Sequence, residues 1–291
     1  MYQLIDLKLG PLASALFPES RPSARGLRKL LAKLNTQLNL GLPDWFFGYG
    51  EDGKCLGTRP NILISENIAP NSLRLTASGP QACELLAQKG WLIQAALMRA
   101  SGEPVPSSDR SGPHAISTIA GPSRSYYMYR MAVGNTLPKS FWWRESQTAE
   151  SGWSDQAYMR LAHVIAESIY LQAADMIRAG DTIEGDIGEW LESRLGDQNP
   201  EANHQLCREF KLRAGLKVTS IGSGNSCVRS TGSRGLKILL RDVEFQARCD
   251  LNGPWAVGAN RIEGFGQIRK STRQQVVCDK GLEPSKEASA L

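Results

Sequence analysis

Histidine is scarce in this sequence, and no cysteine or histidine stands at a spacing typical of a metal site. The 291 residues contain three histidines, and the six cysteines are scattered singly with no CxxC pair. This pattern argues against structural zinc and against a disulfide framework. Buried, reduced thiols are the simpler interpretation. We therefore expect neither a metal nor a cofactor.

Long apolar runs are also missing. No stretch approaches the roughly 20 apolar residues that a membrane helix needs. The first ten residues, MYQLIDLKLG, hold no basic region followed by an apolar block, so we expect no secretory signal, no membrane partner and a cytoplasmic location. Hydrophobic residues make up 41% and charged residues 22%, which indicates an ordinary globular protein rather than a disordered one.

Positive charge is gathered in two places. The net charge is +5 at pH 7, which is modest, so its distribution is more informative than its size. One cluster consists of Arg21, Arg25, Arg28, Lys29 and Lys33, and the other of Arg261, Arg269, Lys270 and Arg273. Each cluster has almost no compensating acid. Two such clusters, far apart in sequence, suggest the two walls of one groove for an anionic ligand.

The first hundred residues predict a compact α+β unit. A strand over residues 2–9 precedes a helix that opens at Pro22 and Ser23 and runs to about Leu40, with leucines on one face and the first basic cluster on the other. Further elements are a strand at 44–49, a strand at 73–76, a helix from Gly79 to near Gly90 and a strand at 91–97. This βαββαβ order is typical of the ferredoxin-like fold, which RNA-recognition modules share.

The rest of the chain predicts a second unit of the same kind. Residues 102–122 are rich in Gly, Pro and Ser and are typical of a linker. A strand at 126–133 follows, then three amphipathic helices, the first capped by Ser154 and the third opening at Pro200, and then strands at 216–221, 236–240 and 243–250. We expect α+β architecture with two ferredoxin-like (RRM-type) βαββαβ domains in tandem. The boundaries are an N-terminal domain at 1–105, a linker at 106–122, a C-terminal domain at 123–275 with a helical insertion at about 140–215, and a flexible tail at 276–291.

Three segments together resemble a known family. They are AKLNTQL at 32–38, LRLTASGPQACELLAQKGWL at 73–92, and AVGANRIEGFGQIRK at 256–270, the last with the spacing G-x-x-R-x-x-G-F-G. This set is similar to the endoribonucleases that process CRISPR precursor RNA, the sixth Cas family within the RAMP superfamily. The likeness is closest to the type I-F branch and its type IV relatives. It covers the first domain and the last sixty or so residues, but not the helical block.

The resemblance implies a metal-independent reaction. In that family the ribose 2′-hydroxyl attacks the adjacent phosphate, which leaves a 5′-hydroxyl and a 2′,3′-cyclic phosphate. A histidine usually assists proton transfer. Here Asn35 stands where the family's histidine falls, and asparagine cannot exchange a proton near neutral pH. For His114, His163 and His204, a surface or packing role is the better interpretation.

Arginine can take over part of the catalytic role of the missing histidine, because its planar guanidinium binds phosphate oxygens and stabilises developing charge. We hypothesise that Arg21 and Arg25 stabilise the transition state, with Asn35 and Ser230 orienting the 2′-hydroxyl. Ser230 lies in a segment that resembles a serine-bearing loop of the type I-F active site.

Binding should rest on contacts between basic residues and phosphates. Gly258, Gly264 and Gly266 are expected to let backbone amides approach phosphates closely. Tyr126, Tyr127, Trp142 and Trp143 are candidates for stacking on bases, although aromatics at this density are more often core. The predicted RNA-binding side chains are Arg28, Lys29, Lys33, Arg229, Arg234, Arg241, Arg261, Arg269 and Lys270.

Two function classes compete for this sequence, and a third has little support. The first is a repeat-specific endoribonuclease that stays on its CRISPR repeat hairpin and joins an effector complex with other subunits. The alternative is a non-catalytic crRNA-binding subunit of such a complex. A ferredoxin-like metabolic enzyme is the third, but no nucleotide-binding, zinc or nucleophile motif favours it.

Overall fold

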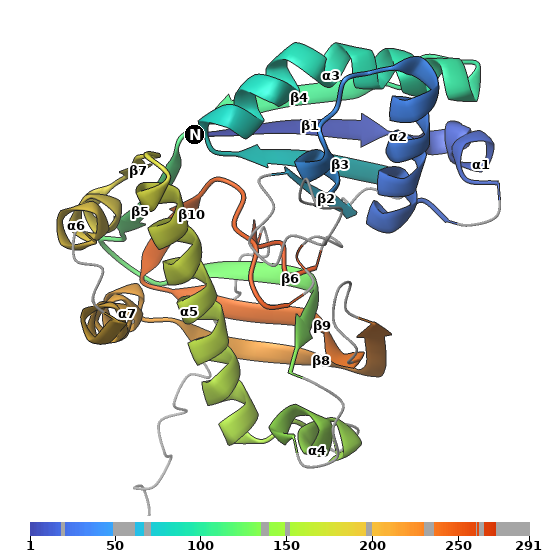
Figure 1. The fold of residues 1–291 in the computed structure, drawn as a ribbon. Coiled ribbons are helices and arrows are strands. Elements are labelled where there is room, and N and C mark those ends of the chain that lie inside the picture. The colour runs from blue at the N-terminus through green and yellow to red at the C-terminus, as the bar shows by residue number, and fades with distance from the viewer. Residues whose placement is uncertain are drawn as a thin grey trace, which may run out of the picture.

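The fold contains helices and three β-sheets, which confirms the predicted α+β class (Figure 1). It is seen in a computed structural model that describes residues 1–18, 21–48, 62–66, 71–134, 140–148, 152–195, 200–229, 236–259, 261 and 265–271. Figure 1 shows an N-terminal sheet with α2 and α3 beside it, and a C-terminal sheet below, with the orange-red segment after β10 between them.

The N-terminal sheet has four antiparallel strands in the order β2-β3-β1-β4. The chain passes through its main elements as strand, helix, strand, strand, helix, strand. Short helical turns precede α2 at η1 (Gly10–Leu12) and α1 (Ala13–Leu16). The main elements are β1 (Tyr2–Lys8), α2 (Ala24–Leu38), β2 (Ile62–Glu66), β3 (Ser72–Ser78), α3 (Pro80–Ser101) and β4 (Ser107–Gly112).

Helix α2 forms where the sequence predicted it. The Ser23 side chain accepts a hydrogen bond from the Gly26 amide and caps the helix, and Asn39 ends it in a left-handed conformation. The leucine face is buried, as Leu27 and Leu31 show with no exposed surface. These leucines pack in one core with the sheet, so the basic face of α2 points away from the sheet.

The two faces of the N-terminal sheet differ in what they contact. Side chains alternate along a strand. Ile5 and Leu7 of β1 belong to the core that α2 and α3 cover. Leu4 instead lines a cleft on the opposite face, and Asp6 follows the same alternation. The helices and the cleft therefore lie on opposite sides of this sheet.

The C-terminal sheet has the strand order β11-β6-β9-β8, with every pair antiparallel. A third, smaller sheet joins β10, β5 and β7, in which β5 pairs antiparallel with β10 and parallel with β7. The strands are β5 (His114–Thr118), β6 (Arg124–Val133), β7 (Ile183–Glu184), β8 (Lys217–Arg229), β9 (Leu236–Ala247), β10 (Cys249–Asn252) and β11 (Arg269–Lys270).

The helical block contributes to the core of this second half. Ser154 caps α5 through the Ala157 amide, as predicted, and Leu161, Ile165 and Ile169 of α5 are buried against the sheet. Between β9 and β11, the described residues form β10 and a loop rather than a second long helix. The helices of the block are α4 (Phe141–Thr148), α5 (Asp155–Arg178), α6 (Asp186–Arg194) and α7 (Pro200–Ala214).

Two predicted strands are wrong. Residues 91–97 belong to α3, which continues through Gly90 because the missing side chain lets the helix approach β1: a Cβ at this position would lie 2.8 Å from Ile5 Cδ1. The aromatic-rich residues Asp44–Phe47 form a 3-10 helix, η2, rather than a strand. The second strand of the sheet is β2, which the sequence interpretation missed.

The segment 106–122, predicted as a linker, carries β4 and β5. Strand β4 is polar and mostly exposed, because it lies at the edge of the sheet and pairs only with β1. An edge strand needs no apolar alternation, so its composition resembled that of a loop. Only Pro113 separates β4 from β5, so the chain passes from the N-terminal sheet to the small sheet within one residue.

Candidate nucleic-acid interface

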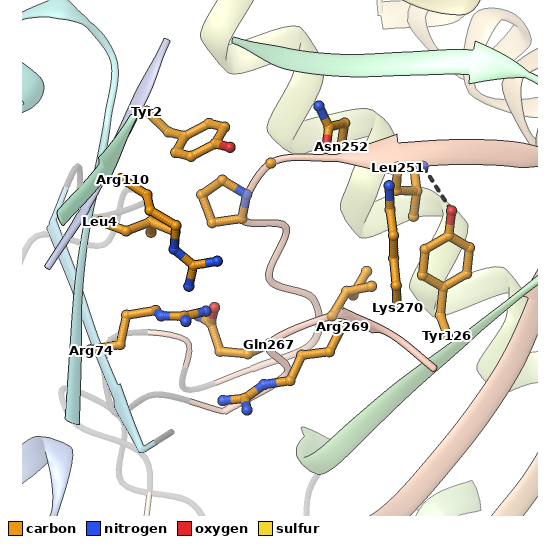
Figure 2. A pocket seen from close by; sticks show the side chains of 13 residues that line it. Tyr2, Leu4, Arg74, Arg110, Tyr126, Leu251, Asn252, Gln267, Arg269 and Lys270 are labelled. Carbon is orange, nitrogen blue, oxygen red and sulfur yellow. Dashed lines mark hydrogen bonds between the residues drawn. The ribbon is translucent and has the colours of Figure 1, made fainter. Parts of the chain in front are cut away.

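A cleft of about 220 Å³ lies between the open face of the N-terminal sheet and the last part of the chain that the structure describes (Figure 2). Strands β1, β3 and β4 form one side, and residues around β10 and β11 form the other. The lining residues are Tyr2, Leu4, Arg74, Arg110, Tyr126, Leu251, Asn252, Gly253, Pro254, Gln267, Ile268, Arg269 and Lys270. Basic side chains thus meet here from three segments that are distant in sequence.

Asp6 holds the two arginines of the N-terminal side. It faces Arg74 directly in the β1–β3 register and accepts hydrogen bonds from Arg74 Nε at 2.6 Å and Nη2 at 2.8 Å. Arg110 Nη2 of β4 donates to the same carboxylate at 3.0 Å. Asp6 is only 6% exposed. Burial alone would raise the pKa of this carboxyl, but the hydrogen bonds and charges of Arg74 and Arg110 outweigh burial and lower it.

Arg269 faces these arginines from the other side of the cleft. It lies in β11, opposite Tyr127 of β6. Burial and the positive charge of Arg74 lower the pKa of Arg269 to about 10, although Asp6 and Tyr127 act in the opposite direction. Figure 2 shows Arg74 and Arg110 extending from one side and Arg269 from the other toward the same space. Arg269 remains protonated at neutral pH, so the cleft is a concentrated positive region.

A second carboxylate organises the rim beside Arg269. Asp250 of β10 forms ion pairs with Lys270 Nζ at 3.0 Å and with Arg124 Nη1 at 2.6 Å. Burial acts to raise the pKa of Asp250, but Lys270 and Arg124 together lower it. The cations named at this cleft outnumber the two carboxylates, so an anionic ligand fits its charge.

The glycine-rich segment makes close contacts within the protein. Gly258 and Gly266 have φ angles of +79° and +74°, which favour glycine. Their amides bond within the protein: Gly258 N donates to Ser168 Oγ at 3.3 Å, and Gly266 N donates to the Arg130 carbonyl at 2.6 Å. The glycines therefore allow tight packing of this turn against α5 and β6. Both amides thus have partners within the protein, and their predicted approach to phosphates stays a prediction.

The two basic clusters are not opposite walls of one groove. Arg21, Arg25, Lys29 and Lys33 are exposed and Arg28 is half-buried, all on or just before α2. Because α2 packs on the sheet face opposite to the cleft, the N-terminal sheet lies between this basic face and Arg269 and Lys270. The wall that faces Arg269 is built from Arg74 and Arg110 instead. Sequence reasoning missed both, since each is an isolated arginine in a strand.

Asn35 is engaged in a local contact. Its Nδ2 donates to the Leu42 carbonyl and its Oδ1 accepts from the Leu42 amide, both at 2.9 Å. The side chain thereby fastens the turn that follows α2. This geometry favours a structural role over orientation of a substrate hydroxyl.

The remaining predicted residues are scattered. Arg241 is half-buried on β9, opposite Arg130. Arg261 is partly buried, which lowers the pKa of its guanidinium, while the charge of Asp175 acts in the opposite direction. The backbone of Arg229 belongs to β8. Ser230, Arg234 and Gly264 lie outside the described residues.

None of the histidines lies in the cleft lining. His114 is fully buried between the rings of Tyr2 and Trp255, and burial lowers its pKa to about 3. His163 and His204 are exposed on α5 and α7, and His163 contacts Lys211. The packing and surface roles expected for these side chains fit their positions.

The aromatic candidates for base stacking divide by burial. Tyr126 is 1% exposed and stacks on Phe245, and Trp142 is 8% exposed, so both are core residues. Tyr127 and Trp143 are half-buried. Tyr129, which was not among the candidates, is 51% exposed, with the Arg130 guanidinium 5.5 Å from its ring centre. The sequence did hold a signal for Tyr129, since it lies two residues after the candidate Tyr127 on the same strand.

The described residues offer no candidate metal site and no candidate membrane span. Within the ranges that the structure describes, no group of three or more His, Cys, Asp or Glu side chains could hold a metal ion. No helix of the described chain is long and apolar enough to span a bilayer. Cys83, Cys207 and Cys249 are buried free thiols.

The fold and this basic cleft define an α+β protein suited to an anionic polymer, and sequence comparison identifies its family. Residues 12–272 match the family described as type IV CRISPR-associated endonuclease Csf5, so the chain belongs to that family, a CRISPR Cas6-type group of RNA-processing endoribonucleases. This confirms the predicted family, although the match also covers the helical block, which the predicted resemblance left out. No curated protein matches the chain at a significant level.

One solved structure shows the same fold. A structure named Csf5, CRISPR-Cas type IV Cas6 crRNA endonuclease is 17% identical with a TM-score of 0.58, and the match covers 93% of this chain and 99% of that one. A crystal structure of Cas6b is 15% identical with a TM-score of 0.49, covering 93% and 98%. At such identity the likeness shows the fold alone.

Proposed function

We propose that this protein is a metal-independent, repeat-specific endoribonuclease that cuts CRISPR precursor RNA beside a hairpin and stays bound to the crRNA. Membership of the Csf5 family is the observation that carries the proposal. The basic cleft and the exposed cations of α2 support binding of a nucleic acid. The reaction belongs to the cytoplasm, and other effector-complex subunits are the expected partners.

The proposed chemistry uses the RNA's own nucleophile. The 2′-oxygen forms a bond to the adjacent phosphorus as the bond to the 5′-oxygen breaks, which leaves a 2′,3′-cyclic phosphate and a 5′-hydroxyl. The 2′-proton leaves to water and the departing 5′-oxygen takes a proton from water. The protein must align the attack and stabilise negative charge on the phosphorus oxygens.

Exposed arginines suit the second task. Arg21 and Arg25, at the start of α2, are our candidates for stabilising the transition state. Ser230 keeps its proposed role in orienting the 2′-hydroxyl. Asn35 has no catalytic role in this scheme, since both of its polar groups already form hydrogen bonds with Leu42. Arg28, Lys29, Lys33, Arg241 and Arg261 are proposed to bind RNA phosphates beyond the reacting one.

The test is cleavage of a repeat RNA by the full chain in EDTA. We expect one cut, a cyclic phosphate product detected by mass spectrometry, and no cut in RNA carrying a 2′-deoxy substitution before the bond. Arg21→Ala and Arg25→Ala should each slow single-turnover cleavage at least about tenfold while weakening binding less. Arg99→Ala, an exposed arginine near the end of α3, is the matched control and should cut normally. Normal cleavage by both α2 variants would exclude these two assignments.

A non-catalytic crRNA-binding subunit is the second candidate. The observation that favours it is the Asn35 contact, since the position that the resemblance gives to histidine serves the fold instead. Tight binding of the repeat RNA without products in the same experiment would support this alternative.

We also propose that the fold is a tandem of ferredoxin-like domains. The first sheet reads β4-β1-β3-β2 and the second β11-β6-β9-β8, so the first, second, third and last strands of each half take the same places. Helix α5 occupies the place of the first helix of the second unit, and a loop stands in place of its second helix. On this proposal the domains meet near Pro113 rather than across a long linker, and α4, α6 and α7 are the added helices.

A further inference from the structure

We propose that the cleft between the two sheets is a binding subsite for one phosphodiester of unpaired RNA, with Asp6 as a positioning residue that aims Arg74 and Arg110 at it. The identity of the ligand rests on the proposed function. The subsite is distinct from the basic face of α2, which lies on the other side of the N-terminal sheet.

Asp6 fixes the orientation of Arg74 and Arg110. Arg74 uses Nε and Nη2 on Asp6, and Arg110 uses Nη2 on the same carboxylate. A guanidinium has five N–H donors, so each arginine has further donors beyond those that Asp6 accepts. The bidentate contact fixes the plane of Arg74, whose side chain is 18% exposed, whereas that of Arg110 is 61% exposed. Asp6 therefore acts as a fixed base for two donors that converge on the cleft.

Positive charge is concentrated at this part of the cleft. Three guanidinium groups lie under the influence of Asp6: those of Arg74 and Arg110 donate hydrogen bonds to it, and its charge acts to raise the pKa of Arg269. The lowered pKa of Arg269 has the charge of Arg74 among its causes, so the two cations disfavour each other across the space. A phosphate between them would relieve this repulsion and accept charge-assisted hydrogen bonds from both walls.

The size of the cleft limits the class of ligand that it can hold. A cavity of about 220 Å³ is smaller than the roughly 300–1,000 Å³ of typical organic-ligand pockets. It has room for a phosphate with part of its sugar, but a base-paired helix is too wide to enter. The ligand class that fits is therefore the backbone of a single strand.

The probe is a fluorescein-labelled decauridylate, which forms no hairpin, and the readout is anisotropy over a series of KCl concentrations with the full-length protein. We expect Arg110→Gln and Arg269→Gln each to weaken binding about fivefold or more. Each should also reduce the steepness of the log–log salt dependence by about 0.7, the contribution of one phosphate contact to a single strand. Arg99→Gln should match the wild type. Equal affinities for the wild type and both cleft variants, or no wild-type binding at 50 mM KCl, would overturn the subsite.

Asp6→Asn separates positioning from simple charge. Removing a negative charge from a cluster of cations should strengthen RNA binding if only net charge matters. If Asp6 positions the arginines, the same change should weaken binding, because the amide offers one acceptor oxygen in place of two. Weaker binding with a normal circular dichroism spectrum supports the positioning role, and tighter binding contradicts it. Should Asp6→Asn fail to fold, the exposed Arg110 still tests the subsite.

The test is independent of catalysis. If the wild type binds decauridylate through Arg110 and Arg269 but leaves repeat RNA uncut, the endonuclease proposal fails and the subsite stands. If repeat RNA is cut but the cleft variants bind decauridylate as tightly as the wild type does, the subsite proposal fails and the endonuclease proposal stands.

Discussion

At the scale of single residues, polar side chains in this protein divide between those that build the fold and those that face a ligand. Asn35 and His114 belong to the first group, because one fastens a turn and the other is enclosed by Tyr2 and Trp255. Arg74 and Arg110 line the cleft, and on our proposal they belong to the second group, although a carboxylate holds both. Residue type alone does not distinguish these groups, since Asn35 was a catalytic candidate and Arg74 was not.

The Asn35 contact gives a prediction about stability. Asn35→Ala removes a donor and an acceptor from Leu42 and should lower the free energy of unfolding by about 1–3 kcal/mol. Chemical denaturation measures this loss, and the exposed neighbour change Gln37→Ala should have little effect. If Asn35 serves only the turn, the variant should still cut repeat RNA at the wild-type rate well below its melting temperature. A large rate loss in a stable variant would restore its catalytic role.

Burial of His114 predicts a pH effect on stability. Its pKa falls from 6.5 to about 3 on folding because burial disfavours the charged ring. The unfolded chain therefore binds the extra proton between these values, and stability falls as the pH drops from about 6.5 toward 3. His114→Phe should flatten this dependence, by up to about 1.4 kcal/mol per pH unit. Denaturation of both proteins at pH 7 and pH 5 measures the difference, and parallel losses would contradict it.

At the scale of elements, the sequence predicted helices better than the strands at sheet edges. The leucine stripe of α2 and the Ser154 cap of α5 were correct, because a buried face and a capping side chain are local signals. The edge strand β4 was missed, because its pairing with β1 depends on backbone partners rather than on composition. Arg74 was missed for a related reason: its partner Asp6 is 68 residues away in sequence.

The close approach of α3 to β1 can be tested by a pair of substitutions. Gly90→Ala should destabilise the fold by about 1–3 kcal/mol, since its Cβ would meet Ile5 Cδ1 at 2.8 Å. Ile5→Val removes that methyl group, so the double variant should be more stable than the two separate losses predict. Thermal denaturation of the four proteins gives the coupling energy. If the two stability losses simply add, a contact other than the one with Ile5 limits the side-chain size at position 90.

Strand β6 offers one exposed ring for stacking. Tyr129→Ala should weaken decauridylate binding by about 1–3 kcal/mol, and Tyr129→Phe should keep most of the affinity, because a nucleobase stacks on either ring. Trp91→Ala, which removes a ring that is 65% exposed on α3, is the matched control. Equal losses for Tyr129→Ala and Trp91→Ala would exclude a specific platform on β6.

At the scale of the whole molecule, the basic face of α2 and the basic cleft are separate regions of the part that the structure describes, rather than two walls of one groove. The basic face of α2 and the cleft lie on opposite sides of the N-terminal sheet, so an RNA that contacts both must pass around its edge. The family and the α+β class were accessible from sequence motifs and periodicity. The relation between the two clusters was not, because it depends on which sheet face each one occupies.

The salt dependence of repeat-RNA binding reports on this arrangement. If about five cations contact phosphates, the log–log slope should be on the order of −4 for a partly duplex RNA. Anisotropy with the labelled repeat between 50 and 300 mM KCl measures it. A flat response would contradict charge-based binding by either region.

The single residue between β4 and β5 has a mechanical consequence. Pro113 joins the N-terminal sheet to the small sheet, and β10 of that small sheet supplies Asp250 and the lining residues Leu251 and Asn252. We expect so short a connection to limit hinge motion between these sheets, so that the spacing between Arg74 and Arg269 changes little when a ligand binds. The RNA must then adopt the shape that fits. The entropic penalty of binding falls on the flexible strand, and RNAs already bent to that shape should be captured fastest.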